Sequence, residues 1–258
     1  MTDRAAVATA DWADLERELD FWRAAGRSAT FWWRDDDAVR PTPALDRFLS
    51  LAGRTPLALA VVPGQAVEAL AERLADCPQV QVLQHGWRHL NHAPFGEKKA
   101  EFGAHRPLRA MLDELAAGWQ RLAELFGQRA VAVLTPPWNR MSAALVPLLN
   151  GAGYTGLSTV GPRRHAEPSP GLRQVNTHAD LVAWQSRNFV GSEPALGFIR
   201  AHLAARRTGT IDAGEPTGLL THHLIMDRDG ALFIERLLDL TRRHKAARWL
   251  GAVEAFAT

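Results

Sequence analysis

The 258-residue sequence is poor in cysteine, and Cys77 is its only thiol. One cysteine cannot form an internal disulfide or a cluster of thiolate ligands, which excludes structural zinc sites of the cysteine type and thioredoxin-like redox chemistry. Long hydrophobic runs are absent too: the longest, such as 57–62, fall far short of the roughly 18 residues that indicate a membrane span. Residues 1–20 lack a positive cluster followed by an apolar core, so we expect no signal peptide, no membrane partner and a cytoplasmic location.

An excess of one charge is also missing, because 30 lysines and arginines stand against 28 aspartates and glutamates. The basic residues are scattered and mixed with acids, so we predict that nucleic acid is not a partner. A chain that is 47% hydrophobic and has no internal repeat is typical of a globular protein. We therefore expect one domain over residues 1–258, and nothing in the sequence indicates its oligomeric state.

Helical and strand-like segments alternate along the chain. Apolar residues recur at helical spacing in residues 12–22, 42–53, 68–74, 108–127, 143–149, 195–205 and 231–240, and we expect the last of these to be the final helix. Short apolar runs predict strands over 30–33, 57–62, 80–84, 130–134, 155–159, 173–177 and 218–221. This alternation is typical of parallel strands joined by helical crossovers, so we predict an α/β fold of about seven parallel strands that is closed, or nearly closed, into a barrel.

The unusual polar residues follow predicted strands. They are Asp35–Asp37, His85 with His89, Pro136–Asn139, His178 with Asp180, and His222 with His223. In a parallel barrel the carboxyl ends of the strands converge on one rim, where such enzymes place their chemistry. We therefore expect these segments to share one pocket.

Two of these segments carry residue types that bind metal ions. Asp35–Asp37 places three carboxylates in a row, and their repulsion would be relieved by a divalent cation or by a shared proton. The alternative is a solvated turn in which one aspartate caps the next helix. His85 and His89 are four residues apart, so on one helical turn both rings would face the same way and could bind one metal ion.

The late histidines and the tryptophans each leave two readings open. His222 and His223 are adjacent at a strand end, so only one of them can face the pocket. Tryptophans accompany the polar segments, and each packs in the core or forms a wall of the pocket; they are Trp32, Trp33, Trp87, Trp138 and Trp184. Trp87 and Trp138 are the best candidates for a wall, because loops carry them.

The order of these motifs resembles that of the polysaccharide deacetylases, which are also called carbohydrate esterase family four. An Asp-Asp pair, an H-x-x-x-H motif, a Pro-Pro-aromatic loop, an Asp-containing segment and a strand that ends in His follow one another between Phe31 and Asp227, which is most of the chain. The resemblance implies a distorted (β/α) barrel, a divalent metal held by Asp-His-His, and hydrolysis of an N-acyl or O-acyl group.

Carried over residue by residue, the resemblance assigns the metal histidines to His85 and His89. The aspartate pair falls on either of two registers. We favour Asp36 as base and Asp37 as metal ligand, because the residue after the pair should be small and Ala38 meets that need; the alternative makes Asp35 the base and Asp36 the ligand.

The remaining family motifs fall on later segments. The general acid corresponds to His222 or His223, and the groove loop to Pro136, Pro137 and Trp138. Asp180 and Trp184 match the family's intermediate Asp-Trp segment, and Trp87 joins them as a candidate for substrate binding.

Three departures separate this sequence from the family pattern. The glycine that usually follows the aspartates is missing, and Asp37 or Ala38 stands in its place. The arginine that usually opens the proline loop is Thr135, so Arg140 or Arg34 would have to supply its charge. The export signal of most secreted relatives is absent, which favours an intracellular small molecule or glycolipid precursor over a cell-wall polymer.

The resemblance implies a metal-dependent hydrolase that removes an acyl group, N-acetyl first, from a sugar or a related small amide. Zn²⁺ is the expected metal, with Co²⁺, Ni²⁺ or Fe²⁺ as alternatives. The base accepts a proton from water and needs a basic neighbour such as Arg140, and the late histidine protonates the departing amine. Two other functions stay open: a cyclic amide or imide hydrolase with the same metal site, and a catalytically silent barrel that binds a carbohydrate or a partner protein.

Overall fold

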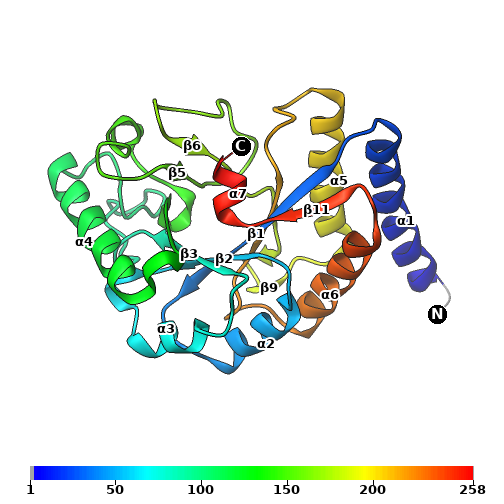
Figure 1. Cartoon of the computed structure of the whole chain (residues 1–258), viewed down its shortest axis with the longest axis horizontal. Coiled ribbons are helices and arrows are strands. Elements are labelled where there is room, and N and C mark those ends of the chain that lie inside the picture. The colour runs from blue at the N-terminus through cyan, green and yellow to red at the C-terminus, as the bar shows by residue number, and fades with distance from the viewer. Residues whose placement is uncertain (1–2, 258) are drawn as a thin grey trace.

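The computed structural model describes the backbone of residues 3–257 and the side chains of residues 12–257. Its helices are α1 (Asp3–Ala24), α2 (Pro43–Ala52), α3 (Glu68–Leu74), α4 (Leu108–Phe126), α5 (Ser192–Thr208), α6 (Arg228–Arg243) and α7 (Ala252–Ala257), with 3₁₀ segments η1 (Pro63–Gln65), η2 (Gly127–Arg129), η3 (Pro137–Asn139) and η4 (Ala143–Leu148). Its strands are β1 (Ala29–Ala38), β2 (Leu57–Val61), β3 (Val80–His85), β4 (Ala130–Thr135), β5 (Gly156–Leu157), β6 (Arg173–Gln174), β7 (Ala179–Asp180), β8 (Val182–Ala183), β9 (Asn188–Phe189), β10 (Thr217–Thr221) and β11 (Ala247–Leu250). Strands and helices alternate as the sequence predicts (Figure 1).

The main sheet curls until its two ends meet. Its parallel strands follow the order β6-β5-β4-β3-β2-β1-β10-β7, and β11 pairs with the first half of β1. The end strands β6 and β7 belong to one segment, 173–180, which pairs with β5, bridges Val160 through Thr177, and pairs with β10. With β6 and β7 counted as one and β11 set aside, the nine strands of this sheet give seven around the barrel. The predicted distorted (β/α) barrel is confirmed.

Alternate side chains of β1 face the two sides of the barrel wall. Phe31 and Trp33 belong to the larger core between the sheet and the helices, whereas Trp32 packs in a smaller cluster with inward residues of β2 to β4 such as Ala60 and Leu83. Helix α7 adds Ala252 and Ala255 to this inner cluster. Because side chains alternate along a strand, the even-numbered residues after Trp32 continue on the inner side, toward the site described below.

Helix α2 begins and ends as its sequence predicts. The Thr42 hydroxyl accepts a hydrogen bond from the backbone N–H of Leu45 (3.0 Å), and Pro43 occupies the first turn, where its missing N–H costs nothing. Gly53 ends the helix at φ 56°, a conformation that glycine adopts without steric cost. This helix packs Leu45, Phe48 and Leu49 into the larger core.

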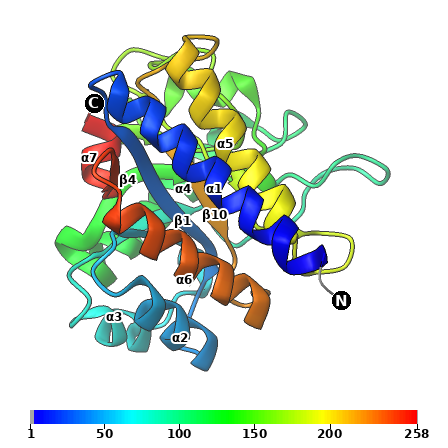
Figure 2. The ribbon, with the colours of Figure 1, turned by 90° about the vertical axis from the view of Figure 1, so that its right-hand side faces the viewer.

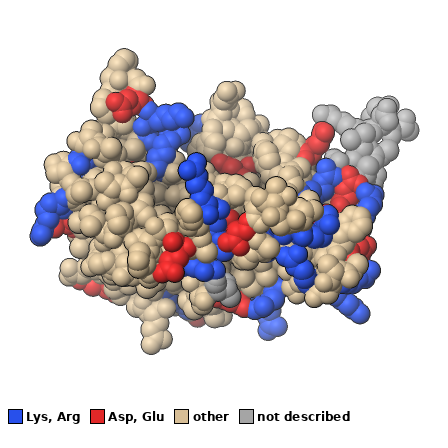
Figure 3. Space-filling view, turned by 90° about the horizontal axis from the view of Figure 1, so that it is seen from above, with Lys and Arg blue, Asp and Glu red and all other residues tan. Residues whose placement is uncertain are grey.

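Helices α1 and α5 lie side by side on one flank of the barrel (Figure 2). Two ion pairs link them, one between Asp14 and Arg200 and one between Glu18 and Arg207, where the guanidinium nitrogens lie 2.7 and 3.0 Å from the carboxylate oxygens. None of the helices in residues 3–257 combines the length and hydropathy that a membrane crossing requires. On the face drawn in Figure 3, lysines and arginines are interspersed with aspartates and glutamates, as the scattered charges of the sequence predict.

Three predicted elements differ from those in the structure in extent, type or order. Strand β1 does not stop at Trp33 but runs through Ala38, because pairing with β10 and β2 satisfies its backbone as far as that residue. The segment 143–149 is a 3₁₀ helix, in which Pro147 cannot donate the hydrogen bond that an α-helix would need. Helix α6 is not the last element, since β11 and α7 follow it.

Candidate metal centre and active site

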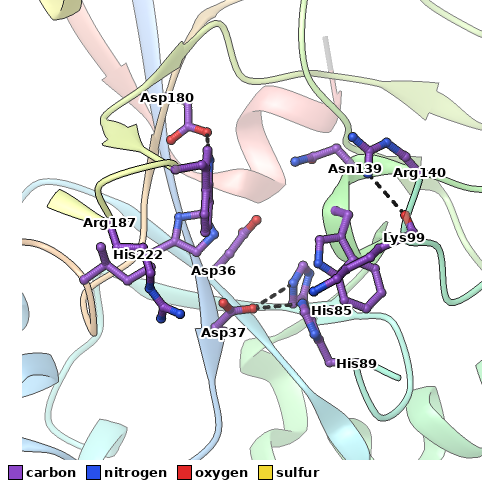
Figure 4. Close-up of a pocket in the computed structure, with 13 residues that line it drawn as sticks. Asp36, Asp37, His85, His89, Lys99, Asn139, Arg140, Asp180, Arg187 and His222 are labelled. Atoms are coloured by element: carbon purple, nitrogen blue, oxygen red, sulfur yellow. Dashed lines mark hydrogen bonds and ion pairs between the residues drawn. The ribbon is translucent and has the colours of Figure 1, made fainter. Parts of the chain in front are cut away.

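A pocket of about 460 Å³ opens at the carboxyl ends of the barrel strands (Figure 4). Its lining comes from Asp36, Asp37, His85, His89, Lys99, Trp138, Asn139, Arg140, Asp180, Trp184, Arg187, His222 and Ile225. These residues stand at or just after the ends of β1, β3, β4, β7 and β10, or in the loops that follow. The predicted convergence is confirmed in that each of the five strands brings at least one polar side chain to the pocket; His178, which was expected there, does not line it.

The three aspartates separate into two groups because β1 bulges at its end. Asp36 follows Trp32 by four residues and points into the pocket, whereas Asp35 points to the opposite side with Trp33. The pairing of β1 with β2 shifts between Asp35 and Ala38, and Asp37 has φ 73°. The bulge therefore turns Asp37 into the pocket as well, so that Asp36 and Asp37 are the two carboxylates that share it.

Asp37, His85 and His89 form a group that could hold one metal ion. Nε2 of His85 lies 3.1 Å from Oδ1 of Asp37, and Nε2 of His89 lies 3.3 Å from the same oxygen (Figure 4). All three potential ligand atoms lie within 4.8 Å of one another. Four ligands about 2.0–2.1 Å from a tetrahedral Zn²⁺ ion would be roughly 3.3 Å apart, so the observed spacing fits such an ion.

The hydrogen bonds of this group leave its metal-facing atoms free. Nδ1 of His85 donates to the carbonyl oxygen of Thr135 (3.0 Å), because a carbonyl can only accept. In neutral His85 the bare nitrogen is then Nε2, which faces the buried Oδ1 of Asp37, an atom without a hydrogen-bond partner among the described residues. Two lone pairs that face each other need a proton or a cation between them, and an Asp-His-His set is typical of divalent metals.

The close approach of Asp37, His85 and His89 shifts the pKa of each of them. Burial opposes ionisation of Asp37, but the nearby imidazoles of His85, His222 and His89 favour the carboxylate, outweigh burial and hold the pKa of Asp37 well below its usual range. Burial would lower the pKa of His85, yet the neighbouring charges of Asp36 and Asp37 raise it. His89 has a lowered pKa, because burial and the charge of His85 both disfavour its protonation.

The loop that presents His89 is not the helical turn that the H-x-x-x-H spacing suggested. His85 is the last residue of β3, and the chain then turns at Gly86 (φ 62°), where a Cβ atom would lie 2.6 Å from Pro137. His89 itself has φ 57°, a left-handed conformation that is uncommon outside glycine. The two rings still reach the same carboxylate, because a strand end and a tight loop bring them together instead of a helix face.

A buried carboxylate, Glu101, holds this loop in place. Its two oxygens accept hydrogen bonds from the backbone N–H groups of Trp87 (3.0 Å), Arg88 (2.7 Å) and Leu90 (3.3 Å). Glu101 is 1% exposed, so these charged hydrogen bonds form away from competing water. Glu101 was not predicted, because no spacing or motif connects it to the residues that it holds.

Asp36 is held by Arg34, its neighbour on the inner side of β1. Nε of Arg34 lies 2.9 Å from Oδ1 of Asp36, and a terminal nitrogen donates to Oδ2 at 3.0 Å, with both side chains buried. Arg34 also donates to Asn139 and Ser158 at 2.7 Å. The alternative basic neighbour, Arg34, is therefore the partner of Asp36, and the prediction that Arg140 is the basic neighbour of this aspartate was wrong.

Arg140 lies at the mouth of the pocket and forms no ion pair with any aspartate whose side chain the structure describes. Its guanidinium donates to the backbone carbonyl of Lys99 (3.2 Å), and its side chain is exposed. The prediction failed because β1 continues past Trp33, which brings Arg34 to the inner wall two residues before Asp36.

Asp35 and His223 form a buried ion pair on the opposite side of the barrel wall. Nδ1 of His223 lies 2.5 Å from one Asp35 oxygen, and the Thr221 hydroxyl donates to the other at 2.7 Å. The charge of Asp35 outweighs burial and raises the pKa of His223. Neither residue lines the pocket, so the assignments of Asp35 as base and of His223 as general acid were wrong, as was Asp36 as metal ligand.

His222 faces the pocket, as one of the two adjacent histidines must. In Figure 4 it lies across the two aspartates from His85 and His89. Its ring stands edge-on to Trp184, with centroids 4.7 Å apart at 90°, and its Nδ1 is buried without a hydrogen-bond partner among residues 12–257.

The turn between β8 and β9 carries Trp184, the residue that contacts His222. Nε1 of Trp184 donates to one oxygen of Asp180 (2.8 Å), and the N–H of Val182 donates to the other (3.0 Å). Burial raises the pKa of Asp180 against these hydrogen bonds. Asp180 and Trp184 therefore line the pocket, as predicted.

The tryptophans and prolines of the rim have different roles. Trp138, at φ 55°, lines the pocket with its ring centroid 4.4 Å from that of His89. Trp87 packs instead against the cluster that contains Met111 and Leu115, under the guanidinium of Arg88. Pro137 is buried beneath Gly86. Trp87 and Pro137 were thus wrong as pocket-lining residues, because both support the loops from behind.

Three lining residues were not predicted: Lys99, Arg187 and Ile225. Asn139 ends the segment Pro136–Asn139 that was expected at the pocket, and it accepts a hydrogen bond from Arg34 (2.7 Å). Lys99 and Arg187 come from loops without regular spacing, and nothing in the sequence pattern marks them.

A second group of potential metal ligands lies outside the pocket. It consists of His178, His202 and Glu215. Nδ1 of His178 accepts a hydrogen bond from the N–H of Gly218 (2.9 Å), so neutral His178 carries its proton on Nε2, 3.4 Å from Glu215. A protonated Nε2 cannot bind a metal, and the group is therefore a buried hydrogen-bonded cluster.

The fold, though not the sequence, matches that of known proteins. No protein-family model matches the sequence, and no curated protein matches it. Solved structures do match. A Mycobacterium smegmatis protein named as a polysaccharide deacetylase has a TM-score of 0.65 and 16% identity, over 89% of this chain and 90% of that one. The fold is that of the polysaccharide deacetylases.

Two further deacetylase-fold structures have known ligands. A family 4 carbohydrate esterase from Streptomyces lividans, in complex with acetate, has a TM-score of 0.56 and 13% identity over 85% of this chain and 90% of that one. A family 4 acetyl xylan esterase from Clostridium thermocellum, in complex with a cobalt ion, has a TM-score of 0.52 and 13% identity over 88% and 90%. Structural matches at sequence identities this low show the fold alone. The activity of this chain therefore has to be argued from its own site.

Proposed function

We propose that this protein is a metal-dependent hydrolase that removes an acyl group, N-acetyl first, from a sugar or a related small amide. One observation carries the proposal: a two-histidine, one-aspartate group shares a pocket with a second aspartate held by arginine and with a histidine on the far side. The same fold in an esterase bound to acetate and in one bound to cobalt supports this assignment.

We propose Zn²⁺ as the native metal, held by Asp37, His85 and His89. Nitrogen and carboxylate donors suit zinc, and Co²⁺, Ni²⁺ and Fe²⁺ accept the same set. A divalent ion in this group would lower the pKa of water and polarise an acyl oxygen.

Asp36 acts as the general base in this proposal. Water that attacks an acyl carbon must lose a proton. Asp36 and Asp180 are the pocket carboxylates outside the metal group, and Asp36 is the one directly next to the ligand Asp37 in the chain, so it is the acceptor that we assign. Its two contacts with Arg34 fix the plane of the carboxylate, so that its orientation toward the pocket is maintained during turnover.

His222 acts as the general acid. An amine is a very poor leaving group until its nitrogen is protonated, and His222 lies across the pocket from the metal group. Trp184 holds the ring edge-on, and Asp180 in turn holds Trp184. Trp138 and Trp184 offer apolar faces to a sugar ring on opposite sides of the pocket.

The test is release of acetate by purified protein supplied with Zn²⁺, on N-acetylglucosamine, its short oligomers and a set of cyclic ureides. We expect acetate from at least one N-acetyl sugar. Asp36→Asn should retain metal and lose at least about 100-fold in kcat/KM, as expected for a missing general base, whereas Asp37→Asn should lose both metal and activity. Asp76→Asn, the same change at an exposed position, should match the wild type.

Two results would contradict the proposal. Metal-loaded protein that hydrolyses no sugar and no ureide would favour a silent binding barrel. Turnover of ureides alone would favour a cyclic amide hydrolase with the same site. A cytoplasmic location and a single domain over the whole chain stay predictions from the sequence.

A further inference from the structure

The charges that line the pocket are separated by depth. Its three aspartates lie beside other polar groups: Asp36 pairs with Arg34, Asp37 lies 3.1 and 3.3 Å from the two imidazoles of the possible metal group, and both oxygens of Asp180 accept hydrogen bonds. Lys99, Arg140 and Arg187 lie at the mouth, are exposed, and form no ion pair with any carboxylate of residues 12–257. The pocket therefore has its acids on the inside, next to Arg34, the histidines and hydrogen-bond donors, and cations without a carboxylate partner at its entrance.

We infer that the substrate carries an anionic group, a phosphate or a carboxylate, and that Lys99 and Arg140 bind it. This inference rests on the proposed function and narrows it to acylated sugars, or related small amides, that bear a negative charge. Arg187 faces the pair from the other side of the pocket and adds to the positive potential that attracts such a substrate (Figure 4).

Lys99 and Arg140 are neighbours although they come from different loops. The Arg140 guanidinium donates to the Lys99 carbonyl (3.2 Å), and the Lys99 ammonium lies 6.0 Å from the ring centroid of Trp138. Trp138 in turn packs on His89. An anionic substituent at this pair would thus lie next to the tryptophan that offers a face to the sugar ring, on the side of the pocket that holds the metal group.

The contacts of Arg140 with the Lys99 carbonyl and of Lys99 with Trp138 leave both cations without a carboxylate partner among residues 12–257. A lysine and an arginine beside each other repel, and within a metal-loaded site the nearby divalent charge adds to that repulsion. Glu97 and Glu101 each lie two positions from Lys99 in the sequence; among residues 12–257, Glu97 forms no ion pair with either cation, and Glu101 accepts hydrogen bonds from the backbone of the loop that carries His89. Arginine and lysine together are typical of sites that bind phosphate or carboxylate groups.

The experiment compares neutral and anionic substrates of one size class. Acetate release is measured from N-acetylglucosamine, its 1-phosphate, its 6-phosphate and N-acetylmuramic acid, with Zn²⁺ present. We expect kcat/KM for at least one anionic sugar to exceed that for the neutral sugar by about tenfold, and the ratio to fall as salt screens the charges. The phosphate and carboxylate arms identify which anion the pair prefers.

Substitutions of single residues test whether Lys99 and Arg140 cause the preference for anionic sugars. Lys99→Gln and Arg140→Gln should each lower the anionic-to-neutral ratio by about fivefold, the scale of a contact between partly exposed charges. Lys98→Gln is the matched control, since Lys98 is an exposed neighbour that does not line the pocket; it should leave the ratio unchanged.

A binding measurement separates this inference from the proposed function. Calorimetry on chelator-treated protein, where phosphate cannot bind a metal, should show tighter binding of an anionic sugar than of N-acetylglucosamine, and Lys99→Gln should remove the difference. Equal binding and equal turnover of neutral and anionic sugars would overturn the inference and leave the deacylase proposal standing. Preferred binding of the anionic sugar without any acetate release would overturn the deacylase proposal and leave the anion site standing.

Discussion

Replacing Glu101 by glutamine should loosen the loop that carries His89. The carboxylate accepts three backbone N–H bonds on two oxygens, and glutamine offers one oxygen and an amide that can only donate. At least one N–H, that of Trp87 if the oxygen turns toward Arg88 and Leu90, would face a second donor in a buried place. One lost charged hydrogen bond costs about 1.5–3 kcal/mol, and the others weaken with the charge, so we expect a loss of about 2–4 kcal/mol in the free energy of unfolding.

Urea unfolding and zinc titration check this prediction. Affinity for zinc should fall by about tenfold or more in Glu101→Gln, as is typical when a group that orients a metal ligand is removed. Glu97→Gln, the same change in an exposed part of the same loop, should alter neither stability nor affinity. If Glu101→Gln unfolds like the wild type and binds zinc equally well, the loop is held by other contacts and the reasoning is refuted.

The remaining predictions concern three histidines. Burial lowers the pKa of His202 to about 2, so the unfolded chain, with an ordinary pKa near 6.5, binds more protons in acid and stability falls as the pH falls below 6.5. Between pH 8 and pH 5 this should cost about 2 kcal/mol in urea unfolding experiments, and His202→Gln should lose that part of the slope; an unchanged slope would contradict it. His222→Gln should lower turnover of an amide substrate by about 100-fold and remove the basic limb of the pH–rate profile. His223→Gln should instead lower stability, because Asp35 would stay buried without its partner, and the surviving folded protein should retain the basic limb; a lost limb in this variant would reverse the roles of the two histidines.

Most elements of the fold could be predicted because their signals are local. Helices such as α2 and α4 repeat apolar residues at helical spacing, and the buried strands β2 and β3 are short apolar runs between breakers. Parallel strands then fix where the chemistry lies, since their carboxyl ends share one rim. The site segments were found for this reason.

The assignments inside the segments depended on where β1 ends. A strand that stops at Trp33 leaves the orientation of Arg34 and the aspartates open, whereas a strand that continues puts Trp32, Arg34 and Asp36 on one side. The favoured pair of Asp36 and Asp37 agrees with the structure, but only because a bulge breaks the alternation at Asp37. A bulge with a non-glycine residue at positive φ has no reliable sequence signal.

Contacts between irregular loops lie beyond sequence reasoning of this kind. Glu101 holds a loop that begins fifteen residues earlier at Gly86, and Lys99 meets Arg140 across 41 positions. Neither pair lies on a repeating face of a helix or strand, so no periodicity in the sequence predicts the contact.

The most direct test of the account is the metal content of purified protein. Elemental analysis after dialysis against Zn²⁺ and then against metal-free buffer should find about one zinc per chain in the wild type and little in His89→Ala, because two remaining ligands rarely hold the ion. His92→Ala, which removes an exposed histidine of the same loop, should retain the full content. Wild-type protein that takes up no divalent metal, or His89→Ala protein that binds as much as the wild type, would contradict the account.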